Sequence, residues 1–140
     1  MTINPLEALA DAIMAFEGWH VSSVSYRNRN PGNLRNSKFK TAMDAKGYAI
    51  FGSMPQGYQA LIIDLTAKVR GHSAHKLTPD STLQNLFDIY APRADNNNPG
   101  AYALFVCSWL CKALGREFTP ASRLRELDGG APAPAAGSEG

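Results

Sequence analysis

Near its start, the chain places apolar residues at alternating intervals of three and four. They are Leu6, Leu9, Ile13 and Phe16. This spacing lines one face of a helix and predicts an amphipathic helix over residues 5–16. Asn4 suits the N-cap of that helix, and Gly18 suits its end. Glu17 then falls in the last turn, where the helix dipole disfavours a negative charge.

Residues 19–39 show no sustained hydrophobic period and are dense in Ser, Asn, Arg and Gly. They predict a long ordered loop with a turn at residues 30–33 (Asn-Pro-Gly-Asn). Long loops inside compact domains are usually functional. Residues 47–51 (Gly-Tyr-Ala-Ile-Phe) are the best short strand of the chain and predict one arm of a small hairpin.

Three later segments again carry apolar residues at helical spacing, namely 56–69, 82–90 and 102–114. Ser53 followed by Gln56 predicts a capping box at the start of the first of them. The third segment is apolar around most of its circumference, so we expect it to be the buried central helix.

Composition fits a single domain with one hydrophobic core. The chain has 140 residues, of which 44% are hydrophobic and 19% charged. We expect this domain to cover residues 1–127. Residues 128–140 lack aromatic and β-branched side chains, and we predict a disordered Ala/Pro/Gly tail there. The predicted fold class is mainly α, formally α+β, with helices and one small β-hairpin.

The charge balance is mildly basic, with a formal net charge of +2. Five of the basic residues cluster in one stretch: Arg27, Arg29, Arg35, Lys38 and Lys40. A solvated loop accounts for this cluster, and so does a surface that faces an anionic cell-wall polymer. Nucleic acid calls for a longer and stronger basic footprint, so we expect no nucleic-acid partner.

The cysteines and histidines give no sign of a cofactor. Cys107 and Cys111 lie four apart in an apolar helical segment, a spacing unsuited to a disulfide, and we interpret them as core thiols. His72 and His75 lack the further ligands that a zinc site needs, so we interpret them as a solvated helix end. We expect no metal and no other cofactor.

Residues 1–14 include Glu7 and Asp11 and lack the basic start and apolar run of a signal peptide. No apolar stretch is long enough to span a bilayer, so we expect no membrane insertion. We expect the protein to be made in the cytoplasm without a signal peptide. If its substrate lies in the periplasm or cell wall, a virion, a holin-type pore or secretion machinery must deliver it.

Glu17 is the strongest candidate for chemistry. It stands between Phe16 and the pair Gly18-Trp19, and aromatic surface raises the pKa of a carboxyl group by desolvating its charged form. A general acid needs such a raised pKa at neutral pH. The alternative is a solvated residue at a helix end, but the apolar neighbours and the polar loop that follows favour catalysis.

Four segments of the chain, taken in order, carry a resemblance to a known family. They are residues 16–18 (Phe-Glu-Gly), residues 27–35 (Arg-Asn-Arg-Asn-Pro-Gly-Asn-Leu-Arg), residues 48–61 beginning Tyr-Ala-Ile-Phe-Gly-Ser, and residues 90–98 (Tyr-Ala-Pro-Arg-Ala-Asp-Asn-Asn-Asn) with Tyr102. Together they resemble the phage-associated, lysozyme-like lytic transglycosylases, whose type is virion-associated or endolysin-like. The ordered coincidence of four motifs is far more specific than any one of them.

The resemblance implies a lysozyme-like fold in which the first long helix delivers a catalytic Glu, here Glu17, to a cleft. It implies a glycosidase that cleaves the MurNAc-GlcNAc bond of peptidoglycan glycan strands. In such enzymes one carboxyl group can suffice, because the N-acetyl group or 6-hydroxyl of the substrate completes the displacement. The product is then a 1,6-anhydro sugar, as for a lytic transglycosylase, or a reducing end, as for a muramidase.

Five further residues are candidates for substrate binding. Asn33 and Asn97 supply amides suited to sugar hydroxyl and acetamido groups, while Tyr48, Tyr90 and Tyr102 offer flat faces for pyranose rings. Structural roles compete with each of these interpretations, because Pro31-Gly32 marks a turn and tyrosines at helix ends are often part of the core.

The sequence offers no clear second acid. Asp44 falls in the hairpin region and is an outside candidate, whereas Asp64 and Asp88 fall on helices. Asp95 suits a cap for the following helix or an anchor for the Asn-rich loop. A single-acid mechanism is therefore favoured over one with two carboxylates.

Two function classes remain open. One is an active peptidoglycan-degrading enzyme, and the other is a virion or injection-apparatus protein that keeps the fold and binds glycan without cleaving it. Glu17 at the matching position favours the enzyme. A basic nucleic-acid-binding module is a third alternative, and it would require salt-steep binding.

Overall fold

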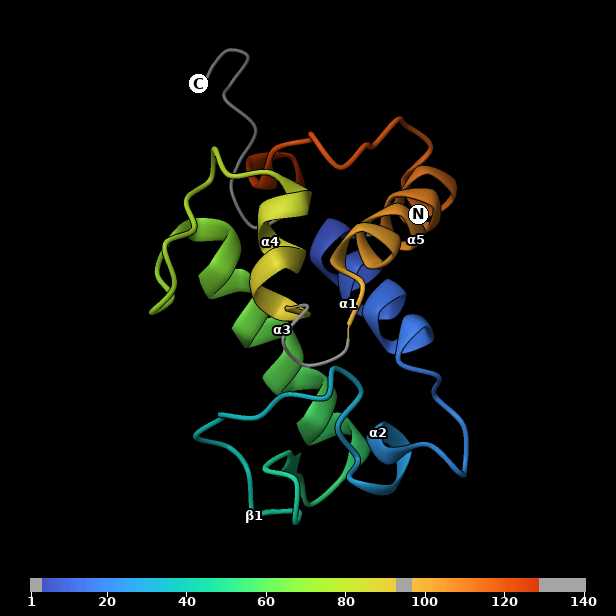
Figure 1. Ribbon diagram of the computed structural model, residues 1–140, viewed down its shortest axis with the longest axis vertical. Coiled ribbons are helices and arrows are strands. Elements are labelled where there is room, and N and C mark those ends of the chain that lie inside the picture. The colour runs from blue at the N-terminus through green and yellow to red at the C-terminus, as the bar shows by residue number, and fades with distance from the viewer. Residues whose placement is uncertain (1–3, 93–96, 129–140) are drawn as a thin grey trace.

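Helices form most of the regular structure in the computed structural model, which describes residues 4–92 and 97–128. In chain order the elements are α1 (Pro5–Phe16), α2 (Val24–Arg27), β1 (Ala42–Met43), β2 (Ala49–Ile50), α3 (Met54–Arg70), α4 (Leu83–Tyr90), α5 (Pro99–Leu114) and the 3-10 helix η2 (Leu124–Leu127). The two strands pair antiparallel in one small sheet. The chain is thus mainly helical with one small hairpin, as the hydrophobic pattern predicts (Figure 1).

Helix α1 has the predicted bounds and the predicted N-cap. The side chain of Asn4 accepts a hydrogen bond from the backbone N–H of Leu6 at 2.8 Å, which satisfies a donor that the helix itself leaves unpaired. The stripe faces the core, and Leu9 and Ile13 are fully buried. Glu17 is the C-cap residue and not a member of the last turn.

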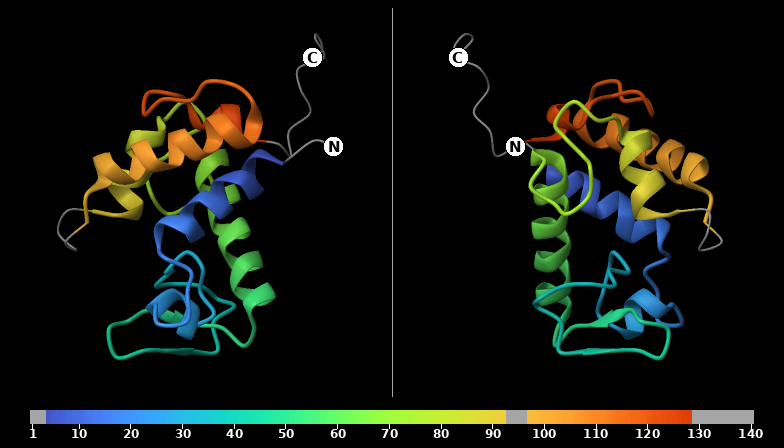
Figure 2. Two further views of the ribbon diagram at one scale, coloured as in Figure 1. Left: turned by 90° about the vertical axis from the view of Figure 1, so that its right-hand side faces the viewer. Right: turned by 60° about the vertical axis from the view of Figure 1, so that its left-hand side comes forward.

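The helices pack around α1. Helix α1 contacts α5 on one side and α3 on the other, α4 packs on α5, and η2 closes the core against α3 and α1. Loop 18–41, α2 and the hairpin gather at the N-terminal end of α3, away from η2 (Figure 2). The site described below lies where this loop region meets the helices.

Helix α5 is not the buried central helix that its composition predicts. Tyr102, Val106 and Leu110 are buried, whereas Leu104 is 62% exposed and Trp109 is 38% exposed. Only α1 and α4 make extensive contacts with α5, so its opposite face meets solvent. The helix also begins three residues earlier than predicted. Pro99 takes its first position, and the Asn98 side chain caps it by accepting a hydrogen bond from the Ala101 N–H.

The predicted long loop contains one short helix, α2, that the sequence pattern does not reveal. Ser23 caps it by accepting a hydrogen bond from the Tyr26 N–H at 3.2 Å. Four residues are too few to show a hydrophobic period. The hairpin is confirmed, although each strand is only two residues long.

Helix caps fix the ends of α3 and α4. Ser53 caps α3 by accepting from the Gln56 N–H at 3.3 Å, which is half of the predicted capping box. A complete capping box occurs instead at α4, where Thr82 and Asn85 each bond the other's backbone N–H. The predicted helix at 82–90 is confirmed from Leu83 onward.

The last described residues, in η2 and at Asp128, pack against the rest of the domain. Leu124 and Leu127 of η2 are fully buried. Asp128, placed in the tail by composition, accepts two hydrogen bonds from Arg70 Nε and one from its Nη2, at 3.0–3.2 Å. Residues 129–140, the remainder of the predicted tail, lie outside the described residues.

Cys107 and Cys111 are free thiols, and Cys107 lies in the core as predicted, whereas Cys111 is only partly buried. Burial is the main cause that raises the pKa of Cys107 to about 11. Within residues 4–92 and 97–128, none of the helices combines the length and apolar character that crossing a bilayer requires.

Candidate active site

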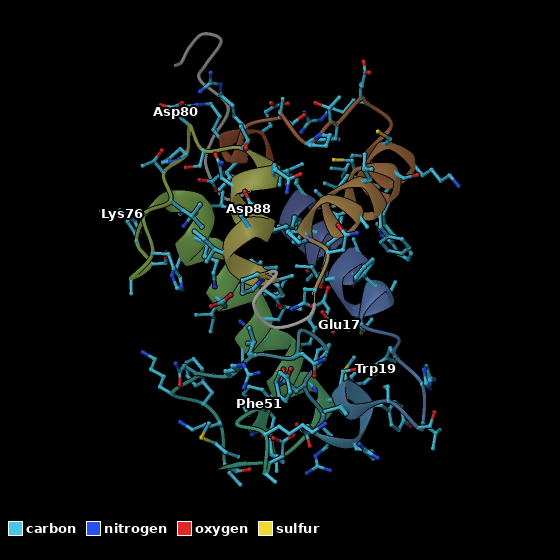
Figure 3. The ribbon with its side chains drawn as sticks, in the orientation of Figure 1. Glu17, Trp19, Phe51, Lys76, Asp80 and Asp88 are labelled. Atoms are coloured by element: carbon cyan, nitrogen blue, oxygen red, sulfur yellow. The ribbon has the colours of Figure 1, made fainter. Side chains whose placement is uncertain are left out.

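The carboxyl group of Glu17 emerges where α1 stops. The Glu17 N–H still donates to the Ile13 carbonyl at 2.9 Å, so its backbone is fixed by the helix. The next residue, Gly18, has a φ of +75° that a side chain would strain, and the chain turns away there. Glu17 is therefore held at the end of α1, and the loop that follows leaves in another direction (Figure 3).

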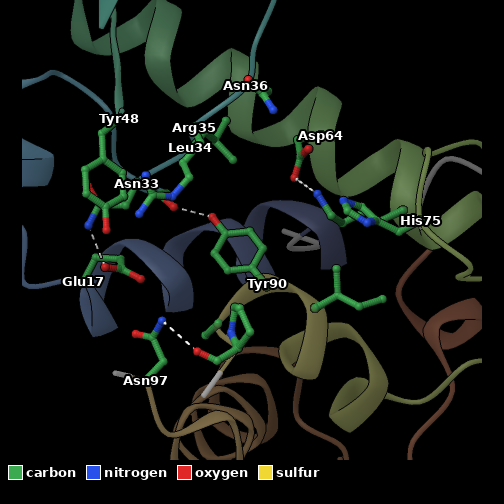
Figure 4. A pocket seen from close by; sticks show the side chains of 15 residues that line it. Glu17, Asn33, Leu34, Arg35, Asn36, Tyr48, Asp64, His75, Tyr90 and Asn97 are labelled. Carbon is green, nitrogen blue, oxygen red and sulfur yellow. Dashed lines mark hydrogen bonds and ion pairs between the residues drawn. The ribbon is translucent and has the colours of Figure 1, made fainter. Parts of the chain in front are cut away.

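Two side chains from distant parts of the chain hold the two oxygens of this carboxyl group. Asn33 Nδ2 donates to Glu17 Oε1 at 2.8 Å, and the Tyr102 hydroxyl donates to Oε2 at 2.8 Å. The contact of Asn33 with Glu17 is drawn in Figure 4. Because both oxygens have a partner, the plane of the carboxyl group is fixed.

The loop turn delivers Asn33 to this position. Asn33 has a φ of +49°, a left-handed conformation that Asn tolerates better than most residues, and its N–H donates to the Asn30 carbonyl at 3.0 Å. The buried Asn30 side chain in turn donates to the carbonyls of Leu34 and Ala49 at 2.9 and 3.0 Å. The predicted turn is thus tied to the hairpin through one buried amide.

Asn33 was predicted to bind sugar, and its observed contact is with the acid. Its Nδ2 bonds Glu17, while its Oδ1 is a buried acceptor without a partner among the described residues. The Asn33 side chain therefore orients Glu17 through its amide nitrogen.

Tyr102 does not offer the sugar-binding face that we expected, and the structure corrects this prediction. Its ring is stacked on Phe16 at a centroid distance of 3.9 Å and on Phe87 at 4.6 Å, and the residue is 1% exposed. A ring covered in this way cannot stack on a pyranose. Its hydroxyl group instead reaches Glu17, across 85 positions of sequence.

The surroundings of Glu17 raise its pKa above 4.5. Desolvation by burial is the largest cause, while the hydrogen bonds from Tyr102 and Asn33 lower the pKa and offset part of that rise. A carboxyl group with a raised pKa keeps its proton nearer to neutral pH. This is the property that a general acid requires.

Glu17 forms one wall of a cleft of about 290 Å³, close to the lower end of the usual range for ligand sites. Loop residues 32–36 and Tyr48 line one side, α4 and the segment after it line another, and α3 contributes Asp64 and Lys68. Figure 4 shows Glu17 and Asp64 at different ends of the cleft, with Tyr90 between them.

Tyr90 connects α4 to the loop. Its hydroxyl donates to the Gly32 carbonyl at 2.5 Å, and a Cβ on Gly32 would lie 2.5 Å from that hydroxyl and 2.6 Å from Leu61. A larger residue at position 32 would have to displace the Tyr90 hydroxyl and the end of the Leu61 side chain. Burial raises the Tyr90 pKa well above 10, and the negative charges of Asp64 and Glu17 add to that effect. Tyr90 is one of the residues that line the cleft, and its role in substrate binding stays a prediction.

Tyr48 and Asn97 also line the cleft. The Arg35 guanidinium lies over the Tyr48 ring, 4.2 Å from its centroid. Asn97 is exposed, and its Nδ2 donates to the Pro92 carbonyl at 3.4 Å. Four of the five predicted binding residues, Asn33, Tyr48, Tyr90 and Asn97, therefore face one cavity together with Glu17.

The far end of the cleft contains residues that the sequence pattern does not reveal. Lys68 is 6% exposed and pairs with Asp64 at 2.5 Å, and His75, interpreted as part of a solvated helix end, lines the same cavity. His72 and His75 follow α3 and are not part of it. The spacing of Asp64 and Lys68 is visible in sequence, but such pairs are usually solvent-facing. Only the packing of α3 turns this pair toward the cleft.

Asp44, the outside candidate for a second acid, has a structural role. Its carboxylate accepts from Asn28 Nδ2 and from the N–H groups of Lys46 and Tyr48, each at 2.9 Å. These bonds, with Asn28 first, lower the pKa of Asp44. Asp44 ties the hairpin turn together and is not among the residues that line the cleft. The prediction for Asp95 lies outside the described residues.

No group of three or more His, Cys, Asp or Glu side chains within residues 4–92 and 97–128 is placed to hold a metal ion. No known family model, curated protein or solved structure matches this chain. The function is therefore argued from the site itself.

Proposed function

We propose that this chain is a peptidoglycan-degrading glycosidase of lysozyme-like fold, which cleaves the MurNAc-GlcNAc bond with Glu17 as its single acid and base. The observation that carries the proposal is the state of Glu17. Its carboxyl group is partly buried, has a raised pKa, is held through both oxygens and lines the cleft. The order of motifs along the sequence supplies the substrate class.

The first chemical step is proton transfer from Glu17 to the glycosidic oxygen. The bond between the anomeric carbon of MurNAc and that oxygen breaks, and the oxygen leaves as a hydroxyl group. The MurNAc 6-hydroxyl then bonds to the anomeric carbon and gives its proton to the Glu17 carboxylate. No water is consumed, Glu17 ends protonated as it began, and the product carries a 1,6-anhydro ring.

The distribution of carboxylates supports the single-acid mechanism. Among the described residues, Asp64 is the only other carboxylate that lines the cleft, and it is paired with the Lys68 ammonium at 2.5 Å. Two-carboxylate glycosidases need both groups directed at one bond, with the second free to act as nucleophile or base. The Asp44 carboxylate is hydrogen-bonded within the hairpin region, and the Asp64 carboxylate is ion-paired with Lys68.

The remaining lining residues suit a glycan. Tyr48, Tyr90 and Asn97 present ring surface and an amide along the cleft, and polysaccharides are bound by such mixtures of aromatic surface and hydrogen-bonding groups. We propose that the partner is the peptidoglycan strand, reached in the periplasm or cell wall after delivery by a virion, pore or secretion machinery.

Digestion of purified peptidoglycan in heavy-oxygen water tests the proposal. The wild-type chain is expected to release muropeptides with unlabelled 1,6-anhydromuramoyl ends. Glu17→Gln keeps the volume of the side chain but has no transferable proton, so its rate should fall by about 10²-fold or more. Label at the new muramic-acid end would identify a muramidase instead. A Glu17→Gln variant that cleaves at the wild-type rate, or a wild-type chain that binds glycan without cleaving it, would overturn the enzyme proposal.

A further inference from the structure

A second cavity lies outside the cleft that contains Glu17. Its volume is about 600 Å³, and it is lined by Trp19, Val21, Tyr26, Arg27, Arg29 and Met54. We refer to it as the aromatic–arginine cavity. None of these residues lines the cleft that contains Glu17. Arg27 and Arg29 belong to the basic cluster of the sequence, and the other four residues were given no role there.

The cavity adjoins the reacting position. Trp19 follows Glu17 by two residues, so their Cα atoms are at most about 7 Å apart. Figure 3 shows Trp19 close to Glu17, on the side of α2. The aromatic–arginine cavity therefore begins within two residues of the acid that lines the cleft.

The apolar part of the cavity consists of Trp19, Tyr26 and Val21, of which Tyr26 and Val21 are exposed to solvent. The rings of Trp19 and Tyr26 are 5.1 Å apart at an interplanar angle of 55°. Tyr26 is 40% exposed and Val21 is 75% exposed. Clustered exposed apolar side chains mark binding sites more often than chance positions do, and amphipathic rings suit the faces of sugars.

The charged part of the cavity consists of two guanidinium groups without a carboxylate partner among residues 4–92 and 97–128. Arg27 and Arg29 are both exposed, and neither takes part in an ion pair. Guanidinium groups bind carboxylates through paired, charge-assisted hydrogen bonds. An anionic group on a ligand would therefore complete this site.

The structure holds Arg29 in place at a cost. Arg29 has a φ of +51°, an unusual conformation for a residue with a long side chain. Its Nε donates to the Phe51 carbonyl at 2.7 Å, and Gly57 of α3 leaves room for the Arg29 carbonyl, which a Cβ would approach to 1.9 Å. Backbone strain of this kind persists where surrounding contacts enforce it, and here those contacts place a guanidinium in the cavity wall.

We propose that the aromatic–arginine cavity binds the carboxylate-bearing peptide stems of the glycan strand next to the bond that Glu17 cleaves. This inference rests on the proposed function and specifies its substrate as stem-bearing rather than bare glycan. Ring surface receives the sugar and the adjoining peptide, and Arg27 and Arg29 receive the carboxylates. Two guanidinium groups are too few for the long basic track of a nucleic-acid site.

The test measures binding in a background that cannot cleave. Glu17→Gln preserves the polymer, and Trp109→Phe leaves Trp19 as the one tryptophan of a chain that has two. Emission from Trp19 then reports occupancy of the cavity itself. The probes are solubilised, uncrosslinked peptidoglycan strands and the same strands with their carboxyl groups amidated, a matched pair that differs only at those groups.

Native strands are expected to bind about tenfold more tightly than amidated strands at low salt, because amidation removes the charge from the hydrogen bonds that the guanidinium groups donate. Arg27→Gln should remove this difference, while the control Lys112→Gln, which removes the same charge from an exposed position on α5, should retain it. Raising the salt concentration should weaken native strands only, and this measurement needs no substitution in the cavity.

Equal affinity for native and amidated strands would overturn the inference, as would equal effects of Arg27→Gln and Lys112→Gln. Tighter binding of a single-stranded oligonucleotide than of native strands would also overturn it and identify a nucleic-acid site. Cleavage is measured separately with the chain that retains Glu17. Charge-dependent binding without cleavage would remove the proposed enzyme alone, and cleavage without charge-dependent binding would remove this inference alone.

Discussion

The Glu17 carboxyl group is subject to two opposing influences. Burial disfavours its charged form, while hydrogen bonds from Tyr102 and Asn33 favour that form, and burial is the larger effect. The result is an acid whose orientation is fixed by donors and whose proton is retained by desolvation. Each influence can be changed separately by substitution.

Tyr102→Phe should shift the pH dependence of cleavage. The hydrogen bond from Tyr102 lowers the pKa of Glu17, so its loss raises that pKa further and moves the alkaline limb of the pH–rate profile to higher pH. The rate at the optimum should fall about tenfold, because one bond to a charged group is lost. Tyr58→Phe is the matched control, since Tyr58 donates to Asp11 at 2.8 Å away from the cleft. A profile that moves equally in both variants would contradict a positioning role for Tyr102.

Glu17→Gln should make the protein more stable at about pH 7. The pKa of Glu17 in the folded chain is raised above its ordinary value of 4.5. Between the pKa of the unfolded chain and that of the folded chain, the folded chain therefore binds more protons. Stability therefore falls as pH rises through this interval, and the loss persists above it. The uncharged Gln avoids this loss, and the difference in melting temperature should vanish at about pH 4.

Asp44→Asn should behave in the opposite way and serves as the control for that experiment. The pKa of Asp44 is lowered by bonds from Asn28 and the hairpin backbone, so its contribution is present at neutral pH and lost as pH falls through the folded pKa. Melting curves in which both variants change stability in the same direction would contradict the assigned pKa shifts.

At the scale of elements, the contact between α3 and the loop that carries Asn33 has no spare room. Gly57 lies in α3 against the Arg29 carbonyl, and Gly32 lies against Tyr90 and Leu61. Two glycines thus allow the loop to approach the helices closely. The cleft exists in its observed shape because these approaches are possible.

Gly57→Ala should destabilise the fold by about 1–3 kcal/mol, because the added Cβ meets backbone that cannot rotate away. Urea denaturation measures this change. Gly100→Ala is the control in the first turn of α5, where the Cβ would meet only Asn98 Oδ1, at 3.5 Å. It should be neutral or up to about 1 kcal/mol more stable. Equal stabilities for the two variants would show that the loop shifts without cost.

At the scale of the whole molecule, the described chain closes on itself through η2 and Asp128. Leu124 and Leu127 are buried in the common core, and Asp128 pairs with Arg70 at the end of α3. The C-terminal limit of the folded domain therefore includes Asp128. Composition placed this limit one residue earlier.

Deletion of residues 129–140 should leave the melting temperature unchanged, because that segment has no aromatic or β-branched side chain to bury. Asp128→Asn in the full-length chain should lower it, because Arg70 loses a charged partner that accepts from two of its nitrogens. Thermal unfolding of the two variants checks both expectations. A large loss on deletion would show that the segment docks on the domain.

The local features of this protein were determined by the sequence. The stripe of α1, its Asn4 cap and the position of Glu17 at the helix end follow from residues within one or two turns of each other. The Asn30–Asn33 turn and the hairpin are local in the same sense. Spacing and cap chemistry suffice for such elements, because their hydrogen bonds join near neighbours.

The tertiary structure alone decided the partners and the exposed faces. Tyr102 was predicted to face substrate and instead lies buried against Phe16, with its hydroxyl on Glu17. Helix α5 was predicted to be buried, and one of its faces is open. Asp64 and Lys68 carry a spacing typical of a solvent-facing pair and instead line the cleft. Periodicity specifies which residues share a helix face, but it cannot specify what that face meets, because packing partners lie far away in sequence.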